Sequence, residues 1–119
     1  RLEVGALAHV VLPESAGRPG PPGKFADKAI DHLLELLAKE QAPSAGLVAK
    51  FAGGASMFNA SGPMQIGEAN IAAVTEQLQA KRIRVAGTHV GGNKGRRITF
   101  NVRTGELVVE IVGLPPIVL

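Results

Sequence analysis

Residues 25–40 carry an apolar stripe that constrains the fold more than any other feature of the chain. Six apolar residues recur here at three- and four-residue spacing, and the acidic residues among them fall on the opposite side of a helix. This spacing predicts an amphipathic helix whose apolar face must be buried against another layer of structure. The six apolar residues are Ala26, Ala29, Ile30, Leu33, Leu34 and Leu37.

Short runs rich in valine, isoleucine and leucine predict the layer that covers this helix. Two helices after early strands, followed by a meander, predict an α/β or α+β sandwich with a mixed sheet and two main helices. The chain has 119 residues, no internal repeat and no long linker, so we expect a single domain. The expected strands are residues 3–12, 47–53, 82–90, 96–102 and 107–113, and the expected second helix is residues 67–81.

The composition argues against several classes of function. The chain has four Phe but no Tyr or Trp, so aromatic platforms for stacking nucleic-acid bases are scarce. The net charge is +3, and the basic run Lys94, Arg96 and Arg97 has no aromatic residues among it. A mild positive excess more often reflects solubility, so no nucleic-acid partner is expected. No apolar run approaches the roughly 20 residues of a bilayer span, so no membrane insertion is expected. The absence of cysteine removes disulfides and thiolate metal sites and fits a reducing compartment.

A histidine, His9, lies in the middle of the first expected strand. Its ordinary interpretation is a core histidine with a hydrogen-bonding neighbour, and its functional interpretation is a general base that acts with a nucleophile. His32 and His89 are not at metal-ligand spacing with it, so no metal is expected. His89 ends an expected strand before glycines, so it is expected to be an exposed loop residue.

Two glycine pairs, in AGGASMF (residues 52–58) and VGGNKG (residues 90–95), directly follow expected strands. They are interpreted as tight turns leaving the sheet, or as places where a substrate backbone approaches closely. Neither is followed by the lysine and hydroxyl residue of a phosphate-binding loop. Ser56 would be a nucleophile only with a base beside it.

Five segments in register resemble one protein family. They are VGALAHVVLP, GKFADKAI, AKFAGGASMF, IGEANIAAV and THVGGNKGRRITFNVRTGELVVEIVG, which follow one another in order over nearly the whole chain. Together they resemble the CheD family, the chemoreceptor glutamine deamidases of bacterial and archaeal chemotaxis. The resemblance implies an α/β sandwich similar to the catalytic domain of cytotoxic necrotizing factor toxins. It also implies hydrolysis of glutamine side-chain amides on methyl-accepting chemoreceptors to glutamate and ammonia.

The resemblance assigns the general base to His9, because the family's histidine belongs to the GAxAHxxLP segment. The family's cysteine nucleophile and its threonine lie upstream of that histidine, and no residue here matches them. We therefore expect residues 1–119 to be a single CheD-like domain that lacks its N-terminal segment and is inactive alone, with no cofactor. The glycine loops are expected to form the substrate-binding rim. The expected rim residues are Gly53, Gly54, Ala55, Ser56, Met57, Phe58, Gly91 and Gly92.

The resemblance also implies partners and a location. Chemoreceptor cytoplasmic domains are the expected substrates, a CheC-type phosphatase is the expected regulatory partner, and the protein is expected in the cytoplasm. A chain without the cysteine could keep only the second role, so the alternative is a non-catalytic chemotaxis adaptor that binds a CheC-type CheY phosphatase. A third interpretation, a ligand-binding α/β domain with the glycine loops around a small molecule, is supported only by loop composition.

Overall fold

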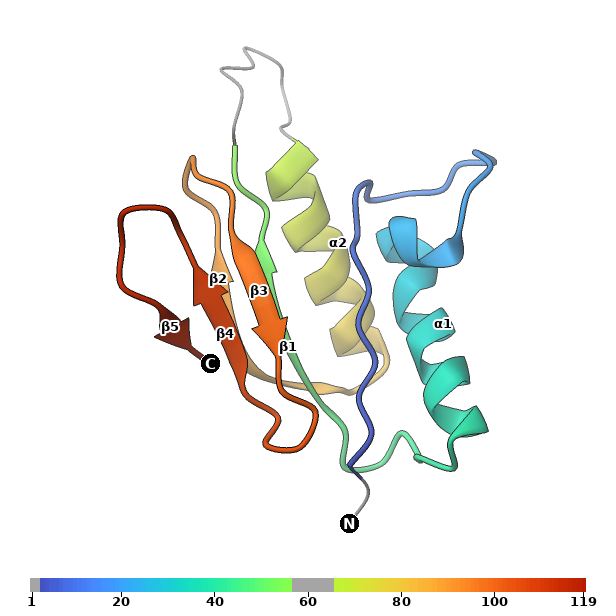
Figure 1. The fold of residues 1–119 in the computed structure, drawn as a ribbon. Helices are drawn as coiled ribbons and strands as arrows, with labels where there is room; N and C mark the ends of the chain where they lie inside the picture. The colour runs from blue at the N-terminus through green and yellow to red at the C-terminus, as the bar shows by residue number, and fades with distance from the viewer. Residues whose placement is uncertain (1–2, 57–65) are drawn as a thin grey trace.

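The fold is an α/β arrangement with two main helices and both parallel and antiparallel strands, as expected (Figure 1). It is described by a computed structural model for residues 3–56 and 66–119. Every element predicted after residue 12 is confirmed, although the bounds of several differ from the predicted ones. In chain order the elements are η1 (Pro22–Lys24), α1 (Ala26–Lys39), β1 (Val48–Gly53), α2 (Ile66–Ala80), β2 (Arg84–Val90), β3 (Arg97–Phe100), β4 (Leu107–Glu110) and β5 (Ile117–Val118).

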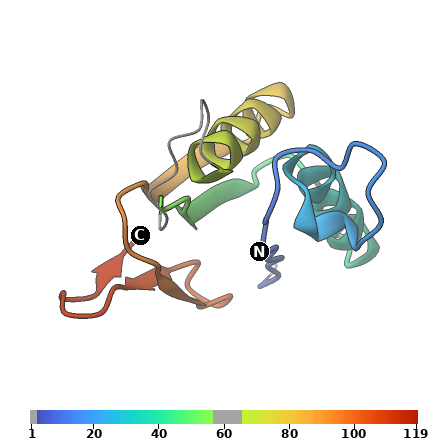
Figure 2. The same cartoon turned by 90° about the horizontal axis from the view of Figure 1, so that it is seen from above.

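The described strands form two sheets. β1 and β2 are parallel and are connected by α2, and because they run in the same direction both strands end at the same edge. At that edge Ala52 pairs with His89, and Gly53 pairs with Val90. β3, β4 and β5 form an antiparallel sheet in that order. Figure 2 shows α2 on one side of the parallel pair and the antiparallel sheet on the other.

The apolar stripe of α1 is buried as predicted. The first turn of the helix is hydrogen-bonded to the preceding loop. The carboxylate of Asp27 accepts hydrogen bonds from the backbone N–H (3.0 and 3.2 Å) and the hydroxyl (3.1 Å) of Ser15. Ser15 is itself buried, so this contact satisfies a polar group that would be costly to bury alone. The buried residues of the helix are Ala26, Ala29, Ile30 and Leu37.

Residues 3–12, called here the His9 segment, do not form the predicted strand. Leu12 makes only an isolated parallel bridge with Phe25. Within the part of the chain that the structure describes, no backbone hydrogen bond joins residues 3–10 to another segment. Exposed and half-buried residues alternate along the segment, so the sequence pattern correctly predicts an extended chain with one side inward. The prediction is wrong because a strand also needs a neighbour, which an alternating pattern does not supply.

Two contacts join these parts of the fold. The ammonium of Lys50 in β1 donates to the main-chain oxygens of Gly105 and Leu119, at 2.7 and 2.8 Å, and so connects the parallel pair to the antiparallel sheet. The His9 segment meets the antiparallel sheet at Gly5, where an added Cβ would lie 2.5 Å from Cε2 of Phe100. Only glycine permits this approach of the backbone to the aromatic ring.

Candidate functional site

His9 is exposed, so its ordinary interpretation as a core histidine is wrong. The chain is held just beyond it. The N–H groups of Val11 and Leu12 donate to the main-chain oxygen of Lys24, at 2.8 and 3.1 Å. The side-chain amide of Asn70, in α2, donates to the main-chain oxygen of Val11 at 2.9 Å. The imidazole is therefore accessible, on a segment that is anchored immediately after it.

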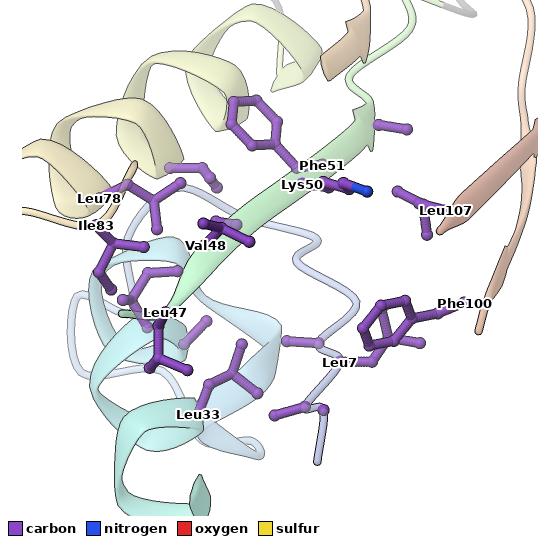
Figure 3. A pocket seen from close by; sticks show the side chains of 18 of the residues that line it. Leu7, Leu33, Leu47, Val48, Lys50, Phe51, Leu78, Ile83, Phe100 and Leu107 are labelled. Carbon is purple, nitrogen blue, oxygen red and sulfur yellow. The ribbon is translucent and has the colours of Figure 1, made fainter. Parts of the chain in front are cut away.

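A cavity of about 450 Å³ lies inward of the His9 segment, among α1, α2, β1 and the antiparallel sheet. Aliphatic and aromatic side chains form most of its wall, and Figure 3 shows three of the lining residues, Leu33, Phe51 and Phe100, on three different elements. Ala8 and Val10 line the cavity, whereas His9 between them does not. The imidazole thus lies outside an apolar cavity whose wall its neighbours form.

The two glycine loops lie side by side. The first, residues 53–56, follows β1, and the second, residues 91–93, follows β2. The N–H of Gly91 donates to the oxygen of Gly53 at 2.9 Å, and the N–H of Ser56 donates to the oxygen of Gly92 at 2.8 Å. Because parallel strands end at one edge, this is the position in which open α/β sheets bind ligands.

The structure brings most of the expected rim residues together. Gly53 and Gly54 line the same cavity as Ala8 and Val10, so the first glycine loop and the His9 segment border one space. Gly91 and Gly92 reach this loop through the two backbone hydrogen bonds, and Ala55 and Ser56 belong to the loop itself. Met57 and Phe58 lie outside the described residues. The substrate-binding role of all these residues stays a prediction.

Gly54 also has a structural reason to be glycine. Its φ is +66°, and an added Cβ would lie 2.5 Å from two side-chain atoms of Ile71 in α2. Gly67, in the first turn of α2, is in turn packed against the main-chain oxygens of Gly54 and Ala55. The first glycine loop therefore packs directly against the N-terminal turns of α2, and this contact fixes the position of that loop.

Arg96 is the residue of this edge that sequence reasoning missed. Its guanidinium donates through Nη2 to the oxygen of Gly91 at 2.8 Å and through Nη1 to the oxygen of Gly53 at 3.4 Å. Its Nε donates to Nδ1 of His89 at 2.8 Å. His89 lies in β2 and is half-buried, so the expectation of an exposed residue is wrong. The only sequence signal was the basic run, which does not distinguish Arg96 from its neighbours.

The other candidate centres are not assembled among residues 3–56 and 66–119. Ser56 makes no hydrogen bond to any of the three histidines, so no serine–histidine pair is formed. His32 lies on α1, with its Nδ1 3.9 Å from the carboxylate of Glu35. Those two ranges contain no group of three or more His, Asp or Glu side chains that could hold a metal ion. They also contain no helix of the length and apolarity that a bilayer crossing requires.

Comparison with known proteins adds the family. The family model described as "CheD chemotactic sensory transduction" matches residues 11–111. The chemoreceptor glutamine deamidase CheD of Thermotoga maritima is 46% identical over 111 residues, which cover 93% of this chain and 70% of that protein. The probable chemoreceptor glutamine deamidase CheD of Syntrophomonas wolfei is 41% identical over 117 residues, covering 94% and 73%. That of Clostridium botulinum strain Hall is 43% identical over 116 residues, covering 93% and 72%.

Proposed function

The chain belongs to the CheD family, and from this premise we propose that it deamidates glutamine side chains on the cytoplasmic domains of chemoreceptors, giving glutamate and ammonia. The proposal is supported by relatives of 41–46% identity that are named chemoreceptor glutamine deamidases. It is also supported by an exposed histidine whose neighbours Ala8 and Val10 line the same cavity as Gly53 and Gly54. The accessible His9 is the observation that carries it.

In this proposal His9 acts as the general base toward a cysteine thiol. The imidazole takes the thiol proton, and the thiolate attacks the carboxamide carbon of glutamine. The tetrahedral intermediate collapses to a thioester when the imidazolium gives its proton to the departing ammonia. Water then attacks the thioester, His9 takes a proton from that water, and the released thiol regains it. The balance is one glutamine and one water converted to one glutamate and one ammonia.

We propose that the nucleophilic cysteine comes from outside the 119 residues, which contain no cysteine. The relatives are longer than the matched region, which covers 70–73% of each. Residues 3–10 have main-chain groups without backbone partners among the described residues, and the cavity behind them is apolar. We propose that further natural chain packs against this segment and carries the cysteine close to His9. Unpaired main-chain groups at such an edge favour addition of a strand.

The test uses the natural full-length protein and a purified chemoreceptor cytoplasmic fragment. Ammonia release and peptide mass spectrometry measure the conversion of receptor glutamine to glutamate. We expect His9→Ala to abolish most of this activity, because removing a general base costs about 10²-fold to 10⁴-fold in rate. The matched control is His32→Ala, which removes a histidine from α1 and should keep full activity. Absence of glutamate product with the wild type, or equal activity of both variants, would overturn the proposal.

The alternative is a non-catalytic adaptor that binds a CheC-type phosphatase, and the observation that favours it is the absence of cysteine from the chain. An adaptor would bind the phosphatase equally well as wild type and as His9→Ala, and the full-length protein would deamidate no receptor. The same two preparations therefore separate the two functions, with binding measured by calorimetry and deamidation by mass spectrometry.

A further inference from the structure

The guanidinium of Arg96 lies between the ends of two parallel strands and contacts both glycine loops. It donates to the oxygen of Gly53, which ends β1, and to the oxygen of Gly91, which follows β2. A third main-chain oxygen, that of Lys94, accepts from Nη1 at 3.4 Å. The N–H of Gly91 also donates a hydrogen bond to the main-chain oxygen of Gly53. The side chain of Arg96 thus joins the two glycine loops to each other at the edge where β1 and β2 end.

His89 determines how this guanidinium is oriented. Because an arginine Nε–H can only donate, Nδ1 of His89 must be the acceptor in the 2.8 Å contact and must carry no proton. This bond fixes the guanidinium at its Nε corner, while Nη1 and Nη2 point to the two loops. The planar group presents its donors in a fixed fork, so the three contacts constrain one another.

Other contacts hold the glycine loops as well, and Arg96 is the side chain that joins one loop to the other. Gly54 is packed against Ile71 of α2, and the N–H of Ser56 is bonded to the oxygen of Gly92. Without the guanidinium, the hydrogen bonds that remain between the two loops among the described residues are the two backbone bonds of Gly91 and Ser56. Glycine residues such as Gly91, at a φ of +82°, have many alternative backbone conformations. A loop that contains them is therefore easily displaced unless other contacts hold it.

We propose that Arg96 is a positioning residue that holds the two glycine loops in the arrangement a receptor segment binds, with His89 orienting it. This proposal rests on the proposed function for the identity of the bound segment. The hydrogen bonds of Arg96 to the two loops, called here the Arg96 clamp, do not depend on that function. The fork is occupied by main-chain oxygens and an imidazole, so Arg96 acts through the loops and does not itself touch the substrate.

The first test measures the clamp directly by hydrogen exchange of backbone amides. In Arg96→Ala we expect the amides of Gly91 and Ser56 to exchange at least about tenfold faster, because their bonds open more often when the fork is removed. Arg97→Ala is the matched control, since it removes the same charge one residue later from an exposed position in β3. Equal exchange of these amides in the two variants would overturn the proposal.

The second test separates positioning from general destabilisation by receptor deamidation kinetics of the full-length protein. Loss of a prearranged rim should raise KM for the receptor fragment about tenfold with kcat changed by less than about twofold. Loss of folded enzyme would instead lower kcat and leave KM unchanged, and that result would overturn the proposal. If the wild type deamidates nothing, the proposed function fails, whereas the exchange test still decides the clamp.

A conservative variant of the orienting residue completes the design. In His89→Asn a side-chain oxygen can replace Nδ1 as the acceptor for Nε of Arg96, so exchange and KM should stay near the wild-type values. In His89→Ala no acceptor remains, and both should move toward those of Arg96→Ala. Arg96→Lys should not restore the clamp, because an ammonium lacks the planar fork. Equal behaviour of the asparagine and alanine variants would contradict the orienting role of His89.

Discussion

The side-chain amide of Asn70 donates a 2.9 Å hydrogen bond to the main-chain oxygen of Val11, two residues beyond His9. This is a link from the rigid helix α2 to a segment whose preceding residues have no backbone partners among those described. The other side-chain atom, Oδ1, is buried and has no hydrogen-bond partner among the described residues. A buried amide oxygen without a partner lowers stability, so we expect the main contribution of Asn70 to be the placement of the His9 segment.

Replacing Asn70 by leucine should therefore separate activity from stability. The variant loses the bond to Val11 but also removes the unsatisfied oxygen, so the free energy of unfolding should change by less than about 1 kcal/mol. Deamidation by the full-length protein should fall by at least about tenfold, because a small displacement of His9, the proposed general base, would lower the rate steeply. Urea unfolding and mass spectrometry measure the two quantities. Gln79→Leu, at an exposed position of α2, is the control, and an active Asn70→Leu protein would contradict the link.

Lys50 should contribute more to stability than any exposed lysine. Its half-buried ammonium bonds the oxygens of Gly105 and Leu119, and Lys50→Met would leave both oxygens without this donor. We expect a loss of about 2 kcal/mol in the free energy of unfolding, since hydrogen bonds to charged groups exceed neutral ones. Urea titration measures it. Lys28→Met, at an exposed position of α1, should change stability by less than about 0.5 kcal/mol, and equal losses would refute the assignment.

Gly54→Ala should test how closely the first glycine loop packs against α2. The added Cβ would meet Ile71 at 2.5 Å and adopt a φ of +66°, so we expect a loss of about 2 kcal/mol from overpacking and backbone strain. Gly46→Ala, at a φ of +84° with open space around it, isolates the backbone part and should cost about 1 kcal/mol.

A double-mutant cycle checks the cause of that loss. When Ile71→Ala is already present, the added cost of Gly54→Ala should fall to the value found at Gly46, because the clash is gone. Chemical denaturation of the four proteins gives the coupling free energy. Additive effects would mean that Ile71 is not what excludes a side chain at position 54.

The elements that could be predicted from the sequence are those whose pattern is local. The stripe of α1 repeats at helical spacing, and each of its buried residues was in the predicted set. The His9 segment also has a local pattern, and its alternation is present in the structure. Its hydrogen-bond partners are not local, however, and no pattern within residues 3–12 states which chain lies beside them.

The candidate site divides in the same way. The glycine pairs were found because they follow strands, and the parallel pairing of β1 and β2 brings them together. Arg96 was missed because adjacent basic residues look alike in sequence, although Arg96 turns inward to three main-chain oxygens while Arg97 is exposed. Which of two neighbouring side chains faces inward depends on where β3 begins, and that is determined by its pairing with β4.

We expect the ring of Phe100 to hold the other end of the His9 segment, where it lies against Gly5. Gly5→Ala would place a Cβ 2.5 Å from the ring, so the segment must shift, at an expected cost of about 1–3 kcal/mol. Gly23→Ala is the control, because its Cβ would make an ordinary 3.7 Å contact with Ala8. Combining Gly5→Ala with Phe100→Leu should make the loss smaller than the sum of the two single losses. Urea unfolding of all four variants measures this, and a Gly5→Ala protein as stable as Gly23→Ala would show that the ring does not hold the segment.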